Sequence, residues 1–449
     1  MHGSNPLSSA ADRNSGTVAV VGLGKIGLPL AAQYIRHGRT VIGCDINPQV
    51  VEGINAGQCH VHEEHGLEQE VAAAVACGTL RADTDTTRAT RQADVIVVIV
   101  PVVVSAEHQP DFRAIDSATR AVGEGLGPGK LVIYETTLPV GTTAERLRRI
   151  LEDASGLVAG RDFLLAYSPE RVSSGVIFRD LATYPKVVGG YDEASAEAAI
   201  AFYQSVLDAK VIRMASANDA EFVKLIETTY RDVNIALANE YARFADAHGL
   251  NVGAAIAAAN TQPYSHIHSP GVGVGGHCIP VYPYFLMAGD DREDLVLPRE
   301  SRVVNDAMAT YATERIEAAL GSLSGQGVLL LGVAYRGNVR ETAFTAARLL
   351  RDALEARGAQ VYAHDPLYSD EEIEAMGYRP LKDDDIPLIR AMIVQAHHQE
   401  YNSFDFSRFH RCELLFDGRQ AFSPEKFEAL GMRYLRLGGG EKIPSPAGL

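Results

Sequence analysis

Short apolar runs and helical patterns alternate along the first third of the chain. The run Thr17–Val21 is apolar and rich in β-branched residues, as expected of a strand buried on both faces. A helical pattern follows from Leu28 to about His37, with Gly38 as its stop, before a second strand at Thr40–Cys44. Two further runs of the first kind are Val95–Val100 and Leu131–Tyr134. We therefore predict a parallel sheet with covering helices.

The middle of the chain changes to one long helical pattern without Pro or Gly, from about Asp219 to His248. Its apolar residues recur near helical spacing, at Phe222, Ile226, Val233, Leu237 and Phe244. Three polar residues at i, i+4 and i+7 share one face of the helix, namely Lys224, Thr228 and Arg231. A glycine-rich loop over residues 270–280 comes next.

A second α/β pattern follows the glycine-rich loop. It begins at Val328–Leu331, continues through a helix around Ala346–Arg357, breaks at Gly358 and resumes as a strand at Gln360–His364. The predicted fold class is α/β, with two Rossmann-like doubly wound domains joined by a central helical domain. The predicted boundaries are a disordered leader or tag over 1–16, a first α/β domain over 17–205, a central helical domain with the glycine-rich loop over 206–305, and a second α/β domain over 306–449.

Composition narrows the class of protein. The chain has 449 residues, which suits two or three domains of about 150 residues each. It has no run of roughly 20 apolar residues, so we expect no membrane partner. A net charge of −16 argues against nucleic acid, which needs clustered Lys and Arg. Five cysteines do not form a disulfide framework, so a reducing cytoplasm is expected.

The first strand leads directly into a G-x-G-x-x-G motif at Gly22, Gly24 and Gly27. Glycines here allow a tight turn and close approach of a pyrophosphate to a helix N-terminus. Asp45 ends the second strand, where its carboxylate would accept hydrogen bonds from ribose hydroxyls and repel a 2′-phosphate. This context predicts a dinucleotide site that favours NAD over NADP.

A second candidate is Cys278, which follows two glycines in the glycine-rich loop. An accessible thiol can act as a nucleophile, although a single cysteine is more often inert. Histidines cluster nearby and in an earlier segment, at His266, His268, His277, His60, His62 and His65. Neither group has the spacing of a metal motif, so we predict no metal site.

Seven segments, in order, carry a resemblance to a known family. They are Gly22–Pro29, Glu135–Thr143, Tyr167–Arg171, Ala220–Lys224, Tyr230–Glu240, Gly275–Pro280 and Leu331–Tyr335. With them the chain resembles the nucleotide-sugar 6-dehydrogenases, which include UDP-glucose and UDP-N-acetyl-hexosamine dehydrogenases. The form Gly-Gly-His-Cys-Ile-Pro and the presence of Arg231 resemble the N-acetyl-hexosamine branch more closely.

The resemblance implies a four-electron oxidation of a sugar C6 alcohol to a carboxylate, with two NAD⁺ used in succession. It makes Cys278 the nucleophile that captures the aldehyde as a thiohemiacetal, later a thioester that water cleaves. Lys224 matches the lysine that stabilises the oxyanion. Glu170 matches the carboxylate that activates the water, as a base if its surroundings raise its pKa, and Thr137 matches the threonine that positions the water.

The resemblance also implies the binding residues and the assembly. Those for NAD are Gly22, Gly24, Lys25, Ile26, Gly27, Asp45 and Thr137. Those for the UDP-sugar are Arg171, Lys224, Thr228, Arg231, Gly275, Tyr282 and Arg336. Family members are typically dimers or larger through the central helix, so a homodimer or higher homo-oligomer is expected.

Several positions depart from the family pattern, and two of them keep other functions open. Tyr282 stands where most relatives have an aspartate, four residues after the cysteine, and Thr228 replaces the usual asparagine one turn after Lys224. These changes suggest a specialised substrate, for polysaccharide or secondary-metabolite synthesis. The alternatives are a UDP-glucose 6-dehydrogenase, an isomerase that retains its NAD, and a degenerate nucleotide-sugar binder.

Overall fold

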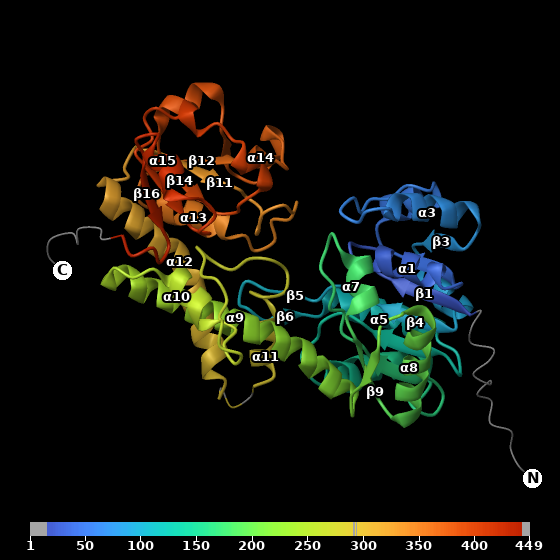
Figure 1. Ribbon diagram of the computed structural model, residues 1–449. Coiled ribbons are helices and arrows are strands. Elements are labelled where there is room, and N and C mark those ends of the chain that lie inside the picture. Colours follow the sequence, from blue (N-terminus) through green and yellow to red (C-terminus); the bar gives the residue numbers. More distant parts are fainter. Residues whose placement is uncertain (1–15, 291, 293, 442–449) are drawn as a thin grey trace, which may run out of the picture. The chain divides into compact units, whose positions relative to one another are not determined.

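The computed structural model describes residues 16–290, 292 and 294–441. The predicted leader lies outside these residues, except for Gly16. The chain divides into two compact units, which are described separately (Figure 1). The first contains residues 1–227 and 284–291, and the second contains residues 228–283 and 292–449.

The first unit is built on an eight-stranded sheet in the order β10-β9-β8-β7-β4-β1-β2-β3. Neighbouring strands are parallel except β8 and β9. The strands are β1 (Thr17–Val21), β2 (Thr40–Cys44), β3 (Leu80–Asp83), β4 (Val95–Val98), β7 (Leu131–Tyr134), β8 (Leu164–Tyr167), β9 (Lys186–Gly190) and β10 (Val211–Arg213). A small antiparallel pair joins β5 (Val103–Val104) to β6 (Pro110–Asp111).

Helices follow most strands of this sheet and supply its crossovers. They are α1 (Gly27–Arg36), α2 (Pro48–Asn55), α3 (Leu67–Ala76), α4 (Thr86–Gln92), α5 (Arg113–Gly125), the π-helix η2 (Thr142–Leu147), α6 (Arg148–Ser155), α7 (Ile177–Thr183) and α8 (Glu193–Val206). Central strands such as β7 and β8 are buried at every position, which explains why their sequences are continuously apolar rather than alternating.

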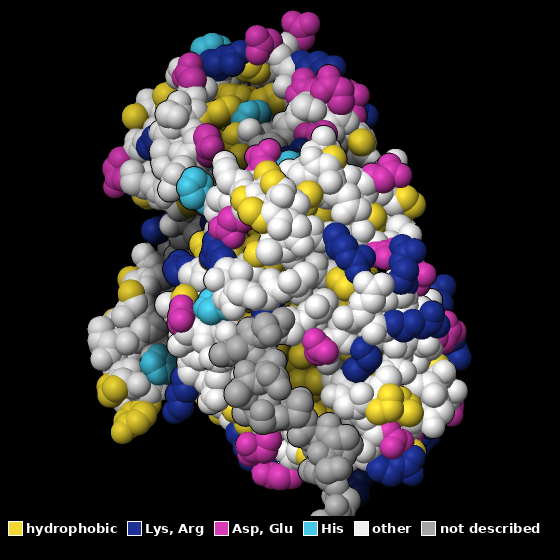
Figure 2. All heavy atoms as spheres, turned by 90° about the vertical axis from the view of Figure 1, so that its right-hand side faces the viewer, with side chains coloured by type: hydrophobic (Ala, Val, Ile, Leu, Met, Phe, Trp, Pro, Cys, Tyr) yellow, Lys and Arg dark blue, Asp and Glu magenta, His cyan; other side chains and the backbone are white. Residues whose placement is uncertain are grey.

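Basic side chains lie among acidic and uncharged ones on the face shown in Figure 2.

The second unit holds a six-stranded sheet in the order β13-β12-β11-β14-β15-β16, with all neighbours parallel. Its strands are β11 (Gly327–Leu331), β12 (Gln360–His364), β13 (Arg379–Pro380), β14 (Ile389–Val394), β15 (Leu414–Asp417) and β16 (Arg433–Arg436). Its helices after β11 are α13 (Ala346–Glu355), α14 (Asp370–Ala375), η3 (Asp383–Leu388), η4 (Gln399–Asn402), η5 (Phe406–Arg408) and α15 (Pro424–Glu428).

Helices fill the stretch of chain between the two sheets. They are α9 (Ala217–His248), α10 (Val252–Ala259), α11 (Tyr282–Ala288) and α12 (Val296–Leu320). The predicted fold class, two doubly wound α/β portions with a helical portion and one long helix between them, is therefore confirmed. None of the helices within the described residues is long and apolar enough to cross a membrane.

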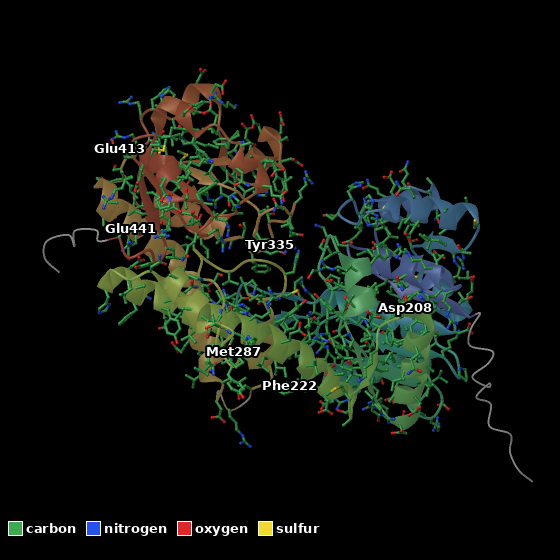
Figure 3. All side chains as sticks on the ribbon, viewed as in Figure 1. Asp208, Phe222, Met287, Tyr335, Glu413 and Glu441 are labelled. Atoms are coloured by element: carbon green, nitrogen blue, oxygen red, sulfur yellow. The ribbon has the colours of Figure 1, made fainter. Side chains whose placement is uncertain are left out.

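The long helix α9 turns its predicted apolar stripe outward. Phe222, Ile226, Leu237 and Phe244 are all exposed (Figure 3 labels Phe222). Its buried positions instead carry mostly small and polar side chains, including Thr229, Asp232 and Asn239 in addition to six alanines. The periodicity therefore identified the helix correctly, but it did not show which side of the helix faces the rest of the chain.

Candidate active site

The glycine-rich turn between β1 and α1 has the geometry of a dinucleotide cradle. Gly22 has a φ of +98°, and a Cβ at Gly27 would lie 1.8 Å from the Gly22 carbonyl oxygen. Gly24, in contrast, has nothing within 4 Å of the place a Cβ would take. A side chain there would fill open space beside the start of α1, where a pyrophosphate would meet free N–H groups. The turn fits the predicted cofactor.

Asp45 is fixed beside this turn at the end of β2. Its Oδ2 accepts a hydrogen bond from Leu23 N at 3.0 Å, and its Oδ1 accepts one from Asn47 N at 2.9 Å. The two remaining predicted cofactor residues in the turn are Lys25, which pairs with Glu63 at 2.9 Å, and Ile26, which occupies the N-cap of α1.

The Asp45→Ser variant is expected to raise KM for NAD⁺ about tenfold, because a hydrogen bond to a charged group contributes about 1.5–3 kcal/mol. Its preference for NADP⁺ over NAD⁺ should increase, because a carboxylate no longer repels the 2′-phosphate. Steady-state kinetics with both cofactors measures this, with the exposed Asp208→Ser as control. Unchanged constants for both cofactors would remove Asp45 from the cofactor site.

The segment after β7 contains Thr137, which is buried. Its neighbour Thr136 donates from Oγ1 to Val100 O at 2.7 Å, tying the segment to the chain after β4. Glu221, near the start of α9, holds the end of the same segment. It accepts hydrogen bonds from Gly141 N at 2.6 Å, Thr143 N at 2.8 Å and Thr143 Oγ1 at 2.6 Å. Burial raises the pKa of Glu221 to about 7 despite these donors.

This shift makes stability depend on pH. In the folded chain Glu221 keeps a proton up to a pH of about 7, whereas in the unfolded chain it loses that proton near its ordinary value of 4.5. Stability is therefore lost as the pH rises through this window, by about 3 kcal/mol in total. We expect wild type to lose this much stability relative to Glu221→Gln between pH 5 and pH 8, as measured by urea unfolding. A difference that stays constant with pH would contradict the assignment.

Glu170 lies in the segment after β8, with both carboxylate oxygens engaged. Its Oε1 accepts from Arg171 N at 2.7 Å and Val172 N at 3.2 Å, and its Oε2 pairs with Lys186 Nζ at 2.7 Å. Burial opposes its ionisation, but Lys186, a hydrogen bond with Glu135 and the Arg171 N–H hold the pKa of Glu170 below its ordinary value. The surroundings therefore keep Glu170 ionised, so that it can orient a water and accept its proton, although as a weaker base than a carboxylate whose pKa is raised.

The predicted sugar-site residues of the first unit lie at the start of α9 and beside it. Lys224 is buried, with 7% exposure. Arg171, next to Glu170, donates from Nε to Glu227 at 2.7 Å, and Glu227 stands three residues after Lys224. This ion pair places the Glu170 segment against the part of α9 that carries Lys224.

The second unit contains the remaining sugar-site residues of α9. Thr228 is buried with 2% exposure, whereas Arg231 is exposed. The predicted polar face of α9 is therefore buried at Thr228 and exposed to solvent at Arg231.

Cys278 is a partly exposed free thiol in the glycine-rich loop of the second unit. The loop lies flat against the chain that follows β11, which explains its glycines. A Cβ at Gly275 would lie 2.7 Å from Tyr335 Cβ, and one at Gly273 would lie 2.7 Å from Ala346 Cβ. Gly276 N also donates to Ala343 O at 2.8 Å.

The far end of the cysteine loop is closed by α11. The N–H of Tyr282, the first residue of that helix, donates to Cys278 O at 2.9 Å, and Tyr282 is partly exposed. On the other side of the thiol, His277 Nε2 lies 3.2 Å from Glu341 Oε2. Arg336, the predicted phosphate or sugar ligand, is exposed, with its guanidinium 5.7 Å from the ring centre of Tyr335, the residue labelled in Figure 3. Cys278 and Arg336 are thus carried by two segments that pack together.

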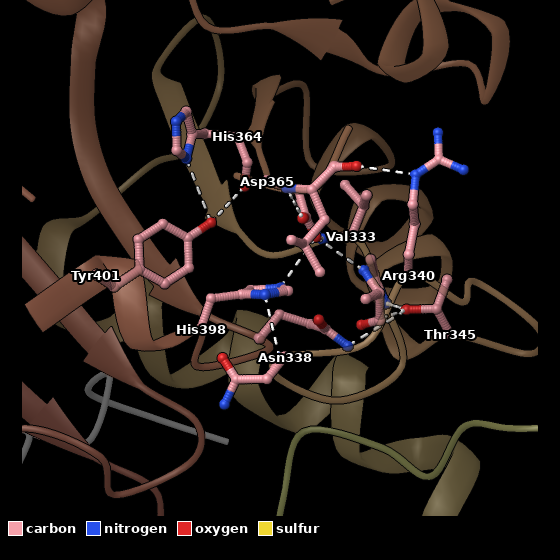
Figure 4. A network of polar contacts seen from close by, with 12 residues as sticks. Val333, Asn338, Arg340, Thr345, His364, Asp365, His398 and Tyr401 are labelled. Carbon is pink, nitrogen blue, oxygen red and sulfur yellow. Dashed lines mark hydrogen bonds and ion pairs between the residues drawn. The ribbon is translucent and has the colours of Figure 1, made fainter. Parts of the chain in front are cut away.

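A buried network at the carboxyl ends of β11, β12 and β14 supports that segment (Figure 4). Asp365 Oδ2 accepts from Val333 N at 2.8 Å and from His398 Nε2 at 3.1 Å. The other ring nitrogen of His398 accepts from Asn338 N at 3.2 Å, which assigns the proton to Nε2. The loop that carries Arg336 is thereby fixed at both Val333 and Asn338.

Four residues at these sites were not singled out from the sequence. They are Glu135, Lys186 and Glu221 in the first unit and Arg419 in the second. Burial lowers the pKa of Arg419 to about 10, its Nε donates to Gln395 O at 2.5 Å, and its Nη1 would lie 2.4 Å from a Cβ at Gly271. Lys186 opens a strand that is buried at all five positions. A lysine at the start of an otherwise apolar strand indicates a buried charge that needs a partner, and this signal could have identified Lys186 from the sequence.

The described part of the chain contains no group of three or more His, Cys, Asp or Glu side chains placed to hold a metal ion.

Comparison with known proteins assigns the chain to a family. Residues 16–207, 218–307 and 329–424 match the NAD binding, central and UDP binding domains of the UDP-glucose/GDP-mannose dehydrogenase family. The chain belongs to this family. The resemblance inferred from the seven sequence segments is confirmed, and so are the NAD cofactor and the classification as an NAD-dependent nucleotide-sugar dehydrogenase.

Similar members of this family share nearly the whole length of the chain. The UDP-N-acetyl-D-mannosamine dehydrogenase of Pyrococcus horikoshii is 34% identical over 431 residues, covering 94% of this chain and 99% of that protein. The NDP-N-acetyl-D-galactosaminuronic acid dehydrogenase of Ralstonia solanacearum is 33% identical over 427 residues, covering 92% and 98%. These relatives confirm the predicted closeness to the N-acetyl-hexosamine branch.

Solved structures agree with the sequence relatives. The UDP-D-ManNAc dehydrogenase of P. horikoshii has a TM-score of 0.86 at 32% identity and covers 95% of this chain and 100% of its own. A UDP-glucose dehydrogenase from Pyrobaculum islandicum has a TM-score of 0.85 at 26% identity and covers 95% and 98%. Enzymes named for UDP-N-acetyl sugars and for UDP-glucose thus share this fold, so the fold alone does not identify the sugar that is oxidised.

Proposed function

We propose that this enzyme oxidises the C6 alcohol of a UDP-N-acetyl-hexosamine to a carboxylate in two successive steps, through an intermediate bound to Cys278. The observation that carries the proposal is the placement of Cys278. Its loop packs on the segment of Tyr335 and Arg336, within the portion that matches the UDP binding domain. A thiol next to that domain can meet the sugar of a bound nucleotide.

The cofactor binds through residues that the first unit has already arranged. Gly22, Gly24 and Gly27 open the turn for the pyrophosphate, and Asp45 is fixed to receive the ribose hydroxyls. When bound, NAD⁺ accepts a hydride from the sugar carbon. Thr137, buried in the segment after β7, is proposed to help hold the cofactor and the water.

Covalent capture keeps the aldehyde on the enzyme between the two oxidations. The Cys278 sulfur bonds to the aldehyde carbon, the carbonyl π electrons move to the oxygen, and that oxygen gains the proton that the thiol loses, giving a thiohemiacetal. The Lys224 ammonium stabilises negative charge on that oxygen. After the second oxidation the carbon is held as a thioester.

Hydrolysis completes the reaction. Water attacks the thioester carbon, the C–S bond breaks, and Cys278 leaves as the thiolate. The ionised Glu170 orients this water and accepts its proton as the bond forms. Because Lys186 keeps the pKa of Glu170 low, the carboxylate is ready throughout the neutral range.

A substrate panel tests the proposal directly. We expect kcat/KM to be highest for one of UDP-ManNAc, UDP-GlcNAc and UDP-GalNAc and lower for UDP-glucose. A higher value for UDP-glucose would make the chain a UDP-glucose 6-dehydrogenase. Binding without any turnover would support a degenerate binder, and conversion without net NADH an isomerase. Equal full rates with all common UDP-sugars would argue against a specialised substrate linked to Tyr282 and Thr228.

Self-association is proposed through the outer face of α9, with a second copy of the chain as the partner. The large exposed side chains on this helix recur at helical spacing, at Phe222, Ile226, Tyr230, Leu237, Tyr241 and Phe244. A continuous apolar stripe on a chain with a net charge of −16 suits a self-complementary interface.

The oligomeric state of the wild-type chain is expected to be a dimer or higher in light scattering after gel filtration. The double change Tyr241→Glu and Phe244→Glu should give a monomer, because it buries charge in the stripe. The exposed Tyr264→Glu is the control and should keep the wild-type state. A wild type that elutes as a monomer would refute the proposed interface.

The compartment is proposed to be the cytoplasm. All five cysteines are free thiols, as expected where disulfides are kept reduced.

A further inference from the structure

Lys186 forms the centre of a buried charge cluster in the first unit. Its Nζ lies 2.7 Å from Glu135 Oε2 and 2.7 Å from Glu170 Oε2. The side chains of Lys186, Glu135 and Glu170 are 5%, 0% and 10% exposed. Lys186 opens β9, Glu135 follows β7, and Glu170 follows β8, so three neighbouring strands bring the charges together.

Aromatic residues from two helices hold the far side of the cluster. Glu135 Oε1 accepts hydrogen bonds from Tyr34 of α1 at 3.0 Å and from Tyr203 of α8 at 2.7 Å. The Lys186 ammonium also lies 4.9 Å from the ring centre of Tyr203. Lys186 therefore cannot leave its position without breaking both ion pairs and leaving the buried Glu135 carboxylate without a cation beside it.

The two carboxylates of the cluster differ in their surroundings. Glu135 is fully buried, and burial together with the nearby charge of Glu170 raises the pKa of Glu135 against the effect of Lys186. Glu170 has Lys186 on one oxygen and two backbone N–H groups on the other. A proton entering the cluster therefore goes to Glu135 first, and Glu170 stays ionised.

The space beside Glu170 and Lys186 is small. A cavity of about 10 Å³ is lined by Glu170, Arg171, Asp180, Tyr184 and Lys186 along with apolar neighbours. That is room for about one water molecule and too little for a sugar. Lys186 thus acts on Glu170 from a side that a substrate does not enter.

We propose that Lys186 is a positioning residue, whose ammonium, held between Glu135 and the ring of Tyr203, orients the Glu170 carboxylate for the water that releases the sugar acid. This inference rests on the proposed function, because it assigns Lys186 to the hydrolytic step. It predicts that removing the ammonium slows hydrolysis at the acid side of neutrality and leaves the first oxidation intact.

The test compares Lys186→Met with Lys186→Arg across pH 5.5–9. In Lys186→Met the pKa of Glu170 should rise, because the neighbouring cation is gone. The acid limb of the kcat profile should therefore move to higher pH by about one unit or more, which is a tenfold loss of kcat at a given pH on that limb. An acyl group should accumulate on Cys278 in intact-mass measurements, while the first-turnover NADH burst and substrate KM stay at wild-type values. Lys186→Arg keeps the cation and should restore the acid limb. The exposed Lys210→Met is the matched control.

Two further variants should move the acid limb of the kcat profile in different directions. Glu135→Gln leaves Lys186 to Glu170 alone, so the acid limb should stay or move to lower pH. The double change Lys186→Met and Glu135→Gln removes one buried charge of each sign. It therefore replaces Lys186→Met if that single variant does not fold. The acid limb of the double variant should still move to higher pH. A Lys186→Met profile equal to that of wild type would overturn the proposal. So would a loss of the NADH burst in step with kcat, which marks a merely structural role.

Infrared titration measures the protonation state of Glu170 without relying on enzyme activity. The carboxyl band of Glu170 is assigned by comparison with Glu170→Gln. Wild type should show no protonated Glu170 at pH 6, and Lys186→Met should show it. Wild type inactive on every nucleotide sugar would overturn the proposed function, whereas an ionised Glu170 in Lys186→Met would overturn the role of Lys186.

Discussion

Replacing Cys278 by serine is expected to lower net turnover by roughly 10³-fold or more, because the attacking nucleophile is lost. A serine hydroxyl is a much weaker nucleophile than a thiolate near neutral pH. Its adduct with the aldehyde cannot become a thioester, so release of the acid is blocked. Stopped-flow and steady-state measurements of NADH formation, with the proposed substrate, follow both halves of the reaction.

The control for this variant is Cys77→Ser, which changes an exposed thiol of the first unit. Its turnover should match wild type. Intact mass after rapid quenching should show a covalent sugar adduct in the wild type and none in Cys278→Ser. A Cys278→Ser enzyme that forms the acid at the wild-type rate would rule out covalent capture by this residue.

Replacing Lys224 by methionine is expected to lower kcat about 10²- to 10³-fold, the loss typical of one oxyanion-stabilising group. Lys224 is a buried cation at the first turns of α9, next to the Arg171–Glu227 ion pair. Methionine keeps most of the chain length but no charge, so binding of the substrate should change less than kcat.

Lys224→Arg should recover part of the lost rate, because a cation remains but its shape differs. The exposed Lys210→Met should behave as wild type. Thermal unfolding of all three variants separates a loss of stability from a loss of chemistry. A Lys224→Met variant that raises KM with kcat unchanged would assign Lys224 to substrate binding alone.

Most of the sheet framework could be predicted because its strands are buried on both faces. Such strands are continuous apolar runs, and the predicted bounds of β1, β2, β7 and β12 agree with the structure to the residue. The strand predicted at Val95–Val100 ends at Val98, because the chain there leaves the sheet to form the segment that Thr136 contacts. Local turn chemistry also predicted well, since Gly38 and Gly358 have φ values of +80° and +79°.

The site was only partly predictable, because several of its contacts join residues far apart in sequence. The sequence motifs assigned a role to Glu170, but none to Lys186 or Glu135, and the contacts among the three residues span three strands. That pairing also decides the condition set for Glu170 as a base, because it lowers the pKa of Glu170 instead of raising it. The periodicity of α9 likewise gave the spacing of its apolar residues but not their exposure, which depends on what packs against the helix.

Thr228 and Tyr282, two of the departures from the family pattern, affect the site unequally. Thr228 is buried on α9, so its side chain bears on packing next to the Lys224 turn. Tyr282 is partly exposed, and its backbone N–H donates to Cys278 O. Any residue except proline supplies that bond, so the cysteine loop keeps its closure without the usual aspartate.

The central claim is a four-electron oxidation through one enzyme, and its most direct test is the amount of NADH formed per sugar consumed. With the best nucleotide sugar of the panel, this account predicts two NADH and one sugar carboxylate for each substrate molecule, with no free aldehyde trapped by hydrazine. A yield of one NADH with a released aldehyde, or sugar conversion with no NADH, would contradict it.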